Sequence, residues 1–304
     1  MKKKILIITG PTGVGKTKLS VELAKMFDAE VISADSCQVY KGFDIGSAKV
    51  TEDEKQGVVH HLIDNRDPYD EYNAGEFARD AKKAIDEIIS KGKLPIIVGG
   101  TGLYINSLLF PLTADGKRDE EYRRELEHIA ELEGKEKLYS MLQEIDSESA
   151  KMLHVNQTDR IIRALEIYHT SGVKKSELKA SDESQYDYLL VVLSRDREEV
   201  YDLINKRVDL MFENGLVGEV QSLLDLGISE NAPAMKGIGY REVVEFIKGG
   251  LSLDETKELI KQKSRNYAKR QLTYFKKMKN ANFVMYNDKK QIISMIQGFL
   301  KEKI

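Results

Sequence analysis

Short apolar runs alternate with longer amphipathic stretches along the first third of the chain. Three short apolar runs are typical of strands buried on both faces, and they span 5–9, 29–35 and 94–100. Three longer stretches repeat apolar residues at helical spacing, and they span 18–27, 74–92 and 103–110. Strands that alternate with helices predict a parallel sheet covered by helices on both faces.

The pattern changes at about residue 115. Residues 115–185 are rich in charge, contain no strand-like run and show short helical patterns, among them a helix at 159–172. Strand character returns at 186–196. A helical segment between two parts of a parallel sheet predicts an inserted all-helical subdomain at 115–185, with 1–114 and 186–304 forming the core.

The last third of the chain is predicted to be mostly helical. Helices are expected at 197–214, 216–226 and 253–279. Pro233, Gly237 and Gly239 predict a loop before the last of them.

Composition narrows the class of protein. The net charge of the 304 residues is only -3, so a polyanion would need a local basic patch. Cys37 is the only cysteine, which rules out an intrachain disulfide and suits a reducing compartment. The apolar run Ile5–Ile8 is too short for a signal segment or a membrane span. We therefore expect a soluble cytoplasmic protein with no membrane association.

One motif carries chemistry directly. The segment GPTGVGKT follows the first predicted strand and precedes a helix, and it comprises Gly10, Pro11, Thr12, Gly13, Val14, Gly15, Lys16 and Thr17. Its glycines let backbone N–H groups approach an anion, the helix N-terminus adds a positive end, and the lysine supplies a charge. The threonine hydroxyl can hold Mg²⁺, the only cofactor that we expect. The motif predicts an α/β fold with a P-loop NTPase-like parallel sheet flanked by helices.

The phosphate loop recognises a diphosphate but not what the diphosphate is attached to. The strand end PIIVGGTGLY offers no carboxylate, although phosphoryl-transfer enzymes place an acid at a strand end to organise Mg²⁺. Asp35 ends the second predicted strand and should therefore point into the same crevice as Lys16. It could act there as a general base, or it could simply cap a turn.

An ordered set of segments covers nearly the whole chain and resembles the tRNA dimethylallyltransferases, also called tRNA isopentenyltransferases. The segments are GPTGVGKT, ISADSCQVYKGFDIGSAK, HHLID, IIVGGTGLYINSLL, DRIIRALEIY, INKRVDLMFENGLVGEV, KGIGYRE and AKRQLTYF. One departure is that Cys37 stands where many relatives have Arg or Met. We therefore expect the Cys37 side chain not to be catalytic.

The resemblance implies transfer of a dimethylallyl group from dimethylallyl diphosphate to the exocyclic amine of the adenosine 3′-adjacent to the anticodon in tRNA, with release of diphosphate. Asp35 matches the family's base, and Thr101 matches a family residue near the reacting centre. Lys16 and the phosphate loop would hold the leaving diphosphate. Arg207 matches an arginine at the diphosphate, although it could also be a solvated helix charge.

The same resemblance implies contacts with the tRNA anticodon stem-loop. The acceptor base must leave its stack, and the residues around it would be Asp35, Ser36, Cys37, Gln38 and Thr101. A contacting residue and a contacting segment are expected in the inserted subdomain, comprising Arg123, Asp159, Arg160, Ile161, Ile162 and Arg163. A second segment, predicted to be a flexible basic loop whose aromatic residue could stack on RNA, comprises Lys236, Gly237, Ile238, Gly239, Tyr240 and Arg241. Basic residues of the last long helix could add contacts or form a solvated face. A monomer is expected.

Two other functions stay open at this point. A P-loop small-molecule kinase would also place an acid after its second strand, but it would not need the GGTGLY strand end. A nucleotide-switched RNA-binding protein would not need Asp35 and Thr101 together. The sequence does not decide whether ATP competes for the loop.

Overall fold

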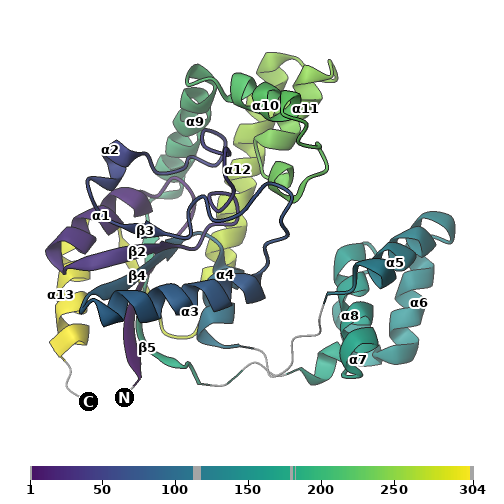
Figure 1. Ribbon diagram of the computed structural model, residues 1–304, viewed down its shortest axis with the longest axis horizontal. Helices are drawn as coiled ribbons and strands as arrows, with labels where there is room; N and C mark the ends of the chain where they lie inside the picture. The colour runs from purple at the N-terminus through teal and green to yellow at the C-terminus, as the bar shows by residue number, and fades with distance from the viewer. Residues whose placement is uncertain (1, 112–117, 179–180, 182, 302–304) are drawn as a thin grey trace. The chain divides into compact units, whose positions relative to one another are not determined.

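The structure is a computed structural model that describes residues 2–111, 118–178, 181 and 183–301 (Figure 1). The chain divides into two units, one comprising Met1–Leu109 with Gln185–Ile304 and the other Phe110–Ser184. The predicted boundaries at 114 and 186 lie within a few residues of these limits. The two units are described separately below.

The described residues of the larger unit form one parallel sheet with the strand order β3-β2-β4-β1-β5-β6. The strands are β1 (Lys3–Thr9), β2 (Ala29–Ser33), β3 (His60–His61), β4 (Leu94–Gly99), β5 (Tyr186–Ser194) and β6 (Ala281–Met285). The parallel sheet predicted from the sequence is thus confirmed, with β3 and β6 as edge strands that it did not predict.

Helices surround this sheet. They are α1 (Lys16–Met26), α2 (Glu52–Lys55), α3 (Ala74–Ser90), α4 (Gly102–Leu109), α9 (Arg197–Glu213), α10 (Leu216–Asp225), α11 (Tyr240–Ile247), α12 (Leu253–Phe275) and α13 (Lys289–Lys301), with a short 3₁₀ turn η2 at Pro233–Lys236. Figure 1 shows α1 and α13 on one side of the sheet and α3 on the other. α12 ends four residues before the end of the helix predicted at 253–279. The sequence did not predict α2, α11 or α13.

The core on one face of the sheet explains why the centre of β1 is apolar. Leu6 and Ile8 of β1 pack with Leu19 of α1 and with Ile292 and Ile296 of α13. On the opposite face, α3 packs against β2 and β4 through a buried stripe, which comprises Phe77, Ala81, Ala84, Ile85 and Ile88. Because both faces are covered, every side chain from Ile5 to Ile8 is fully buried.

A second core lies between α9, α10, α11 and α12. Val208, Leu216, Val243 and Ile260 pack there against Phe43, which belongs to the segment after β2. Each large apolar side chain buried there stabilises the packing by about 2 kcal/mol. This burial therefore holds the segment after β2 against the C-terminal helices.

The smaller unit is a set of packed helices. They are α5 (Glu120–Leu132), α6 (Lys135–Ile145), α7 (Ser147–Met152) and α8 (Thr158–Ser171), followed by the turn η1 (Lys175–Glu177). Leu126, Leu142, Ile161 and Leu165 form its core. The described part of this unit contains no strand, in agreement with the helical pattern of the sequence.

A glycine at the end of β4 gives a test of the packing. A Cβ added to Gly99 would lie 2.1 Å from the carbonyl oxygen of Ala34, so the backbone directly after β2 would have to move. We expect Gly99→Ala to lower the free energy of unfolding by about 1–3 kcal/mol, as overpacking does. Urea denaturation followed by circular dichroism measures the effect.

The matched control is Gly298→Ala in α13, where an added Cβ meets no atom within 4 Å. It should raise the free energy of unfolding by up to about 1 kcal/mol, because alanine favours a helix more than glycine does. Equal effects of the two substitutions would contradict the close approach of β2 and β4.

Candidate active site

The register of three neighbouring strands assembles the predicted residues. Thr9 of β1 pairs with Gly99 of β4, and Ser33 of β2 pairs with Val98 of β4. The segments that follow these strands therefore begin side by side at the carboxyl edge of the sheet. Because β4 lies between β1 and β2, Thr101 follows the strand between those that lead to the phosphate loop and to Asp35.

The phosphate loop depends on two glycines that admit neighbouring groups. Gly10 has a φ of 143°, and a Cβ there would lie 2.6 Å from the carbonyl oxygen of Leu193 in β5. Gly15 has a φ of 103°, and a Cβ there would lie 2.5 Å from the ring of Tyr286. Gly15 also precedes α1, whose first N–H groups have no partner within the helix. The loop therefore has the backbone geometry of an anion site.

Lys16 folds back over the loop. Its ammonium group donates hydrogen bonds to the carbonyl oxygens of Gly10 and Pro11, at 3.0 and 2.9 Å. Burial, aided by the positive charge of Arg207, lowers the pKa of Lys16 to about 7, although the carboxylate of Asp35 acts in the opposite direction. A bound anion would favour the charged form of this lysine.

Arg207 reaches the loop from α9. Its guanidinium group donates to the hydroxyl of Thr12 at 3.2 Å and to the carbonyl oxygen of Ser47 at 3.3 Å. Burial lowers the pKa of Arg207, whereas the negative charge of Asp35 raises it. This arginine is therefore not a solvated helix charge, because it lies against the phosphate loop.

Asp35 holds a turn and lines the crevice at the same time. Its Oδ1 accepts hydrogen bonds from the backbone N–H groups of Cys37, at 2.8 Å, and Gln38, at 3.2 Å. Its charge influences both Lys16 and Arg207. The turn role that the sequence left open is therefore real, and it fixes the carboxylate close to the two cations.

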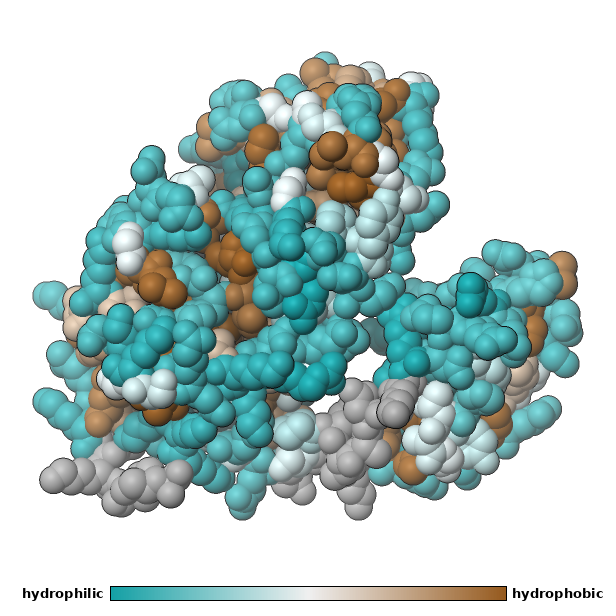
Figure 2. Space-filling view, in the orientation of Figure 1, coloured by the Kyte–Doolittle hydropathy of each residue, from teal (hydrophilic) through white to brown (hydrophobic). Residues whose placement is uncertain are grey.

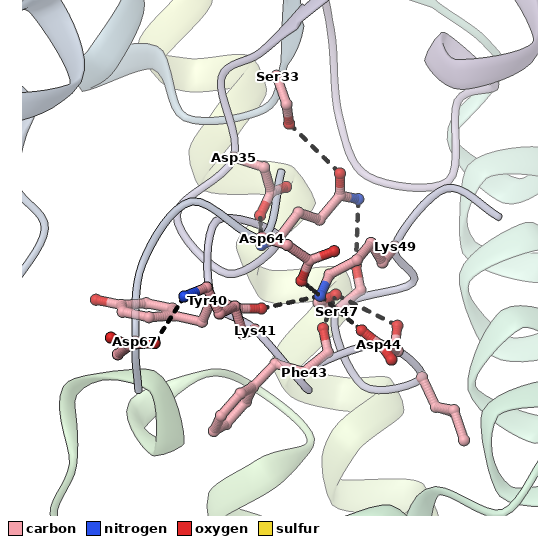
Figure 3. A network of polar contacts seen from close by, with 12 residues as sticks. Ser33, Asp35, Tyr40, Lys41, Phe43, Asp44, Ser47, Lys49, Asp64 and Asp67 are labelled. Atoms are coloured by element: carbon pink, nitrogen blue, oxygen red, sulfur yellow. Dashed lines mark hydrogen bonds and ion pairs between the residues drawn. The ribbon is translucent and has the colours of Figure 1, made fainter. Parts of the chain in front are cut away.

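A network centred on Lys49 supports this turn (Figure 3). The Lys49 ammonium donates to the carboxylates of Asp44, at 2.6 Å, and Asp64, at 2.5 Å, and to the carbonyl oxygen of Tyr40, at 2.8 Å. Gln38 donates to the carbonyl oxygen of Ala48 at 3.0 Å. The segment after β2 is therefore held by its own polar contacts as well as by its core.

Cys37 lies beside Asp35 in this segment. Burial raises the pKa of the Cys37 thiol to about 12, and the negative charge of Asp35 acts in the same direction. The thiol is therefore neutral at physiological pH and is a poor nucleophile, which supports the prediction that it is not catalytic.

A small cavity of about 50 Å³ lies beside the loop. Its lining comprises Lys16, Thr17, Ser20, Val31, Ser33, Asp35, Gln38, Val50, His60, Ile63, Val98 and Gly99. Thr17 and Asp35 thus share one cavity. Within the described ranges, no group of three or more His, Cys, Asp or Glu residues could hold a metal ion.

Two residues of α12 complete the site. The sequence pattern did not predict that either side chain lies there. Gln271 is buried and contacts the phosphate loop, while Tyr267 interacts with the side chain of Thr101. Gln271 lies in the AKRQLTYF segment, and Tyr267 immediately precedes it. Their one-turn spacing was visible, but nothing in the sequence showed which face of the helix meets the sheet.

The predicted flexible basic loop at 236–241 is wrong in part. Its last two residues begin α11, and the Tyr240 side chain is fully buried. The Tyr240 hydroxyl donates to Glu219 at 2.9 Å and accepts from the backbone N–H of Ser47 at 3.1 Å. This ring therefore cannot stack on a base, whereas Lys236 and Arg241 are exposed.

The rest of that segment adjoins the turn after β2. A Cβ added to Gly237 would lie 3.2 Å from the sulfur of Cys37. Ile238 packs against the second core, and Gly239 is buried as the residue before α11. Two segments expected to contact tRNA, 35–38 and 236–241, are therefore neighbours within the larger unit.

In the smaller unit, only some side chains of the segment 159–163 are exposed and could contact RNA. Ile161 and Ile162 are buried in the helical core, so their side chains cannot contact RNA as predicted. Asp159 and Arg160 are exposed at the start of α8. Burial lowers the pKa of nearby Lys175, and the charges of Arg160 and Arg163 lower it further, so a positive cluster lies at this end of α8.

A buried glutamate orders the arginines of this cluster. Glu166 is fully buried and accepts from Arg163 at 2.7 Å and from the backbone N–H of Asp119 at 3.0 Å. A guanidinium nitrogen of Arg123 lies 3.8 Å from the same carboxylate. The predicted Arg123 and Arg163 are therefore held in place by a carboxylate in the core.

The outer face of α12 is basic. A surface hollow there is lined by Asn266, Lys269, Arg270, Thr273, Tyr274 and Lys277. Hydrophilic residues cover most of the face of the molecule in Figure 2. In the described part of the chain, no helix has the length and apolar character needed to cross a membrane.

Comparisons with known proteins now decide the family. A family model described as IPP transferase matches residues 38–278. This chain belongs to the IPP transferase family. It is 45% identical to a tRNA dimethylallyltransferase of Acetivibrio thermocellus, over 97% of each chain.

Solved structures agree with this assignment. A tRNA isopentenylpyrophosphate transferase of Bacillus halodurans is 41% identical, with a TM-score of 0.74, and the match covers 99% of this chain and 97% of that one. A eukaryotic dimethylallyltransferase acting on tRNA is 30% identical, with a TM-score of 0.84, and the match covers 99% of this chain and 80% of that one. The IPP transferase chain is thus an enzyme of prenyl transfer with a P-loop NTPase-like fold. The comparisons favour neither the kinase nor the nucleotide-switched RNA-binding protein.

The lowered pKa of Lys16 predicts a pH-dependent affinity for diphosphates. The free loop loses its lysine charge as pH rises through about 7, whereas a bound diphosphate keeps the lysine protonated. Affinity for dimethylallyl diphosphate should therefore fall as pH rises above this value, by up to about tenfold per pH unit. Isothermal titration calorimetry in buffers of different ionisation enthalpy should detect the accompanying proton uptake.

Lys16→Arg is the control for this titration, because a guanidinium stays charged throughout the range. It should remove the proton uptake and leave only the pH dependence of the ligand's own ionisation. The same proton uptake in this variant would contradict the assignment to Lys16.

The buried position of Tyr240 predicts a structural role. Tyr240→Phe leaves the buried N–H of Ser47 without its acceptor, so the free energy of unfolding should fall by about 1–3 kcal/mol. The affinity for tRNA should not change, as measured by filter binding. The comparison variant is Tyr168→Phe on the exposed surface of α8. A loss of tRNA affinity at unchanged stability in Tyr240→Phe would restore the stacking role.

Proposed function

We propose that the chain transfers a dimethylallyl group from dimethylallyl diphosphate to the exocyclic amine of the adenosine 3′-adjacent to the anticodon in tRNA, and releases diphosphate. One observation supports this proposal above the others: two cations, Lys16 and Arg207, lie against the phosphate loop within the electrostatic influence of the Asp35 carboxylate. The tRNA names of the relatives supply the acceptor class.

The phosphate loop has the groups that a leaving diphosphate requires. Cleavage of the allylic C–O bond sends its electron pair to the diphosphate oxygen, which gains negative charge. The N–H groups at the start of α1, together with Lys16 and Arg207, would stabilise that charge more in the transition state than in the bound substrate.

Asp35 and Thr101 would handle the acceptor. An adenine amine is a weak nucleophile because its lone pair is delocalised into the ring. As the bond forms between this nitrogen and the first carbon of the prenyl chain, the nitrogen must lose a proton, and the Asp35 carboxylate would accept it. Thr101 follows the strand next to that of Asp35 and would orient the diphosphate or the base.

Mg²⁺ fits the same site as a shared ion. Thr17 is exposed at the start of α1 and lines one cavity with Asp35. This arrangement suits Mg²⁺, which binds one or two protein ligands and takes its other ligands from phosphates and water. When bound, the ion would neutralise charge on the diphosphate.

The tRNA-facing surface would combine basic residues with the neighbouring segments 35–38 and 236–241. Lys236, Arg241, Lys269 and Arg270 are exposed in the larger unit and would contact phosphates of the anticodon stem-loop. Arg123, Arg160 and Arg163 would do so from the smaller unit. A tRNA substrate supports a cytoplasmic location.

A transfer assay tests the proposal directly. The protein, Mg²⁺, unmodified tRNA and dimethylallyl diphosphate labelled in the prenyl group should give label in tRNA and free diphosphate in equal amounts. Nuclease digestion and mass spectrometry should place the group on the adenosine after the anticodon. ATP-dependent phosphorylation of an acceptor, with no label in tRNA, would refute the proposal and favour a kinase.

Asp35→Asn tests the base. Asparagine keeps an acceptor for the two backbone N–H groups of the turn but cannot take a proton. We expect the transfer rate to fall by at least about 10²-fold, at the level that general-base catalysis contributes. Affinity for dimethylallyl diphosphate should stay within a few-fold of the parent's, as measured by calorimetry.

Asp53→Asn provides a control, because Asp53 is exposed in α2 and does not belong to the Lys49 network. It should leave the transfer rate nearly unchanged. Equal losses of rate and diphosphate affinity in Asp35→Asn would argue against a general base and for a role in shaping the loop.

A further inference from the structure

Gln271 bridges two loops of the active site. Its side-chain carbonyl accepts the backbone N–H of Thr12 in the phosphate loop at 2.9 Å, and its amide nitrogen donates to the carbonyl oxygen of Gly100 at 3.0 Å. The residue is only 5% exposed. A buried carboxamide bonded at both ends is fixed in position, because breaking either bond would leave a buried polar group without a partner.

The chain is shaped to admit this residue. A Cβ at Gly100 would lie 2.2 Å from the Gln271 amide nitrogen. A Cβ at Gly102 would lie 2.4 Å from the ring of Tyr274, one turn further along α12. The two glycines that flank Thr101 therefore allow α12 to approach the loop after β4 closely.

Tyr267 extends the same set of contacts to Thr101. It lies one turn before Gln271 and interacts with the side chains of both Gln271 and Thr101. Burial raises the pKa of Tyr267 to about 12, and the negative charge of Asp35 acts in the same direction, so its hydroxyl stays neutral. One face of α12 thus contacts both the phosphate loop, through Gln271, and Thr101, through Tyr267.

We propose that Gln271 is a positioning residue that sets the separation between the phosphate loop and Thr101. This inference rests on the proposed function. In an in-line transfer, the diphosphate and the acceptor nitrogen must lie on opposite sides of the same carbon. A displacement of about 1 Å between the groups that hold them can slow such a reaction about 10²-fold. Gln271 fixes that distance through its hydrogen bonds to the backbone of both loops.

Gln271→Met is the first test. Methionine has a similar length and fills the buried site, but it can make neither strong hydrogen bond. We expect kcat to fall about 10- to 100-fold, while KM for tRNA and the affinity for dimethylallyl diphosphate change by less than about threefold, which is under 1 kcal/mol.

Thr256→Val is the matched control. Thr256 is fully buried in the same helix, and its hydroxyl bonds to the carbonyl oxygen of Ser252, away from the site. The control loses one buried hydrogen bond of α12, so it should lower the unfolding midpoint. It should leave kcat within about twofold of the parent's, because the lost contact lies at the start of α12 and involves no residue of the site.

A double-mutant cycle isolates the contact. Gly100→Ala should lower kcat in the parent, because the added methyl group displaces the Gln271 amide. In a Gln271→Ala background the same methyl group has room, so the second substitution should cost less than in the parent. Additive effects would overturn the proposal.

Tyr267→Phe keeps the test valid if Gln271→Met does not fold. It removes only the hydroxyl and should lower kcat several-fold at little change in the unfolding midpoint. Parent-like kcat in both variants would overturn the inference, as would losses of kcat that track stability along the same line as Thr256→Val. If the parent itself transfers no prenyl group, the proposed function fails, and that outcome is distinct from failure of the Gln271 inference.

Discussion

The register of β1, β4 and β2 is the constraint on which the site depends. These three strands pair directly, and Gly99 lets the ends of β4 and β2 approach until only a glycine fits against the carbonyl group of Ala34. The backbone N–H of Thr101 donates to that same carbonyl group. The relative positions of the phosphate loop, Asp35 and Thr101 therefore follow from backbone hydrogen bonds of the sheet, which are harder to disturb than contacts between side chains.

Helices from the second half of the chain then adjust what the sheet has assembled. α9 brings Arg207 to Thr12 and Ser47, and α12 brings Gln271 to Thr12 and Gly100. A loop at the edge of a parallel sheet can adopt several conformations, so a contact with another element is needed to hold it in one of them. In this chain the partners are the polar side chains of Arg207 and Gln271, with two hydrogen bonds each.

The sequence predicted the central part of the fold because buried parallel strands leave a strong signal. β1, β2, β4 and β5 are apolar runs bounded by glycine or charge. The strands at the edges leave a weaker one: β3 has two residues, and β6 is half-exposed with Phe283 and Met285 facing outward. α11 was missed because glycines around it indicated a loop, although Gly239 only begins the helix.

The site shows the same division. Gly10–Thr17 and Asp35 could be predicted because local spacing and strand ends define them. The buried positions of Tyr240, Ile161 and Ile162 could not, because a motif that is shared within a family records packing as well as contact with the substrate. Ile161 and Ile162 lie between two arginines on α8, and only the helical core shows which side chains face inward. Tyr267 lacked any signal of its own until α12 was placed against the sheet.

Lys16 in its folded-back position has a consequence for selectivity. Its ammonium donates to two carbonyl groups of the loop when no ligand is bound, so a ligand must replace these two hydrogen bonds to draw the lysine toward itself. An anion with a single weak charge gains little by drawing the lysine away from these oxygens. A diphosphate offers several oxygens and enough charge to replace both bonds, so we expect the folded-back lysine to favour diphosphates over small anions of single charge such as chloride.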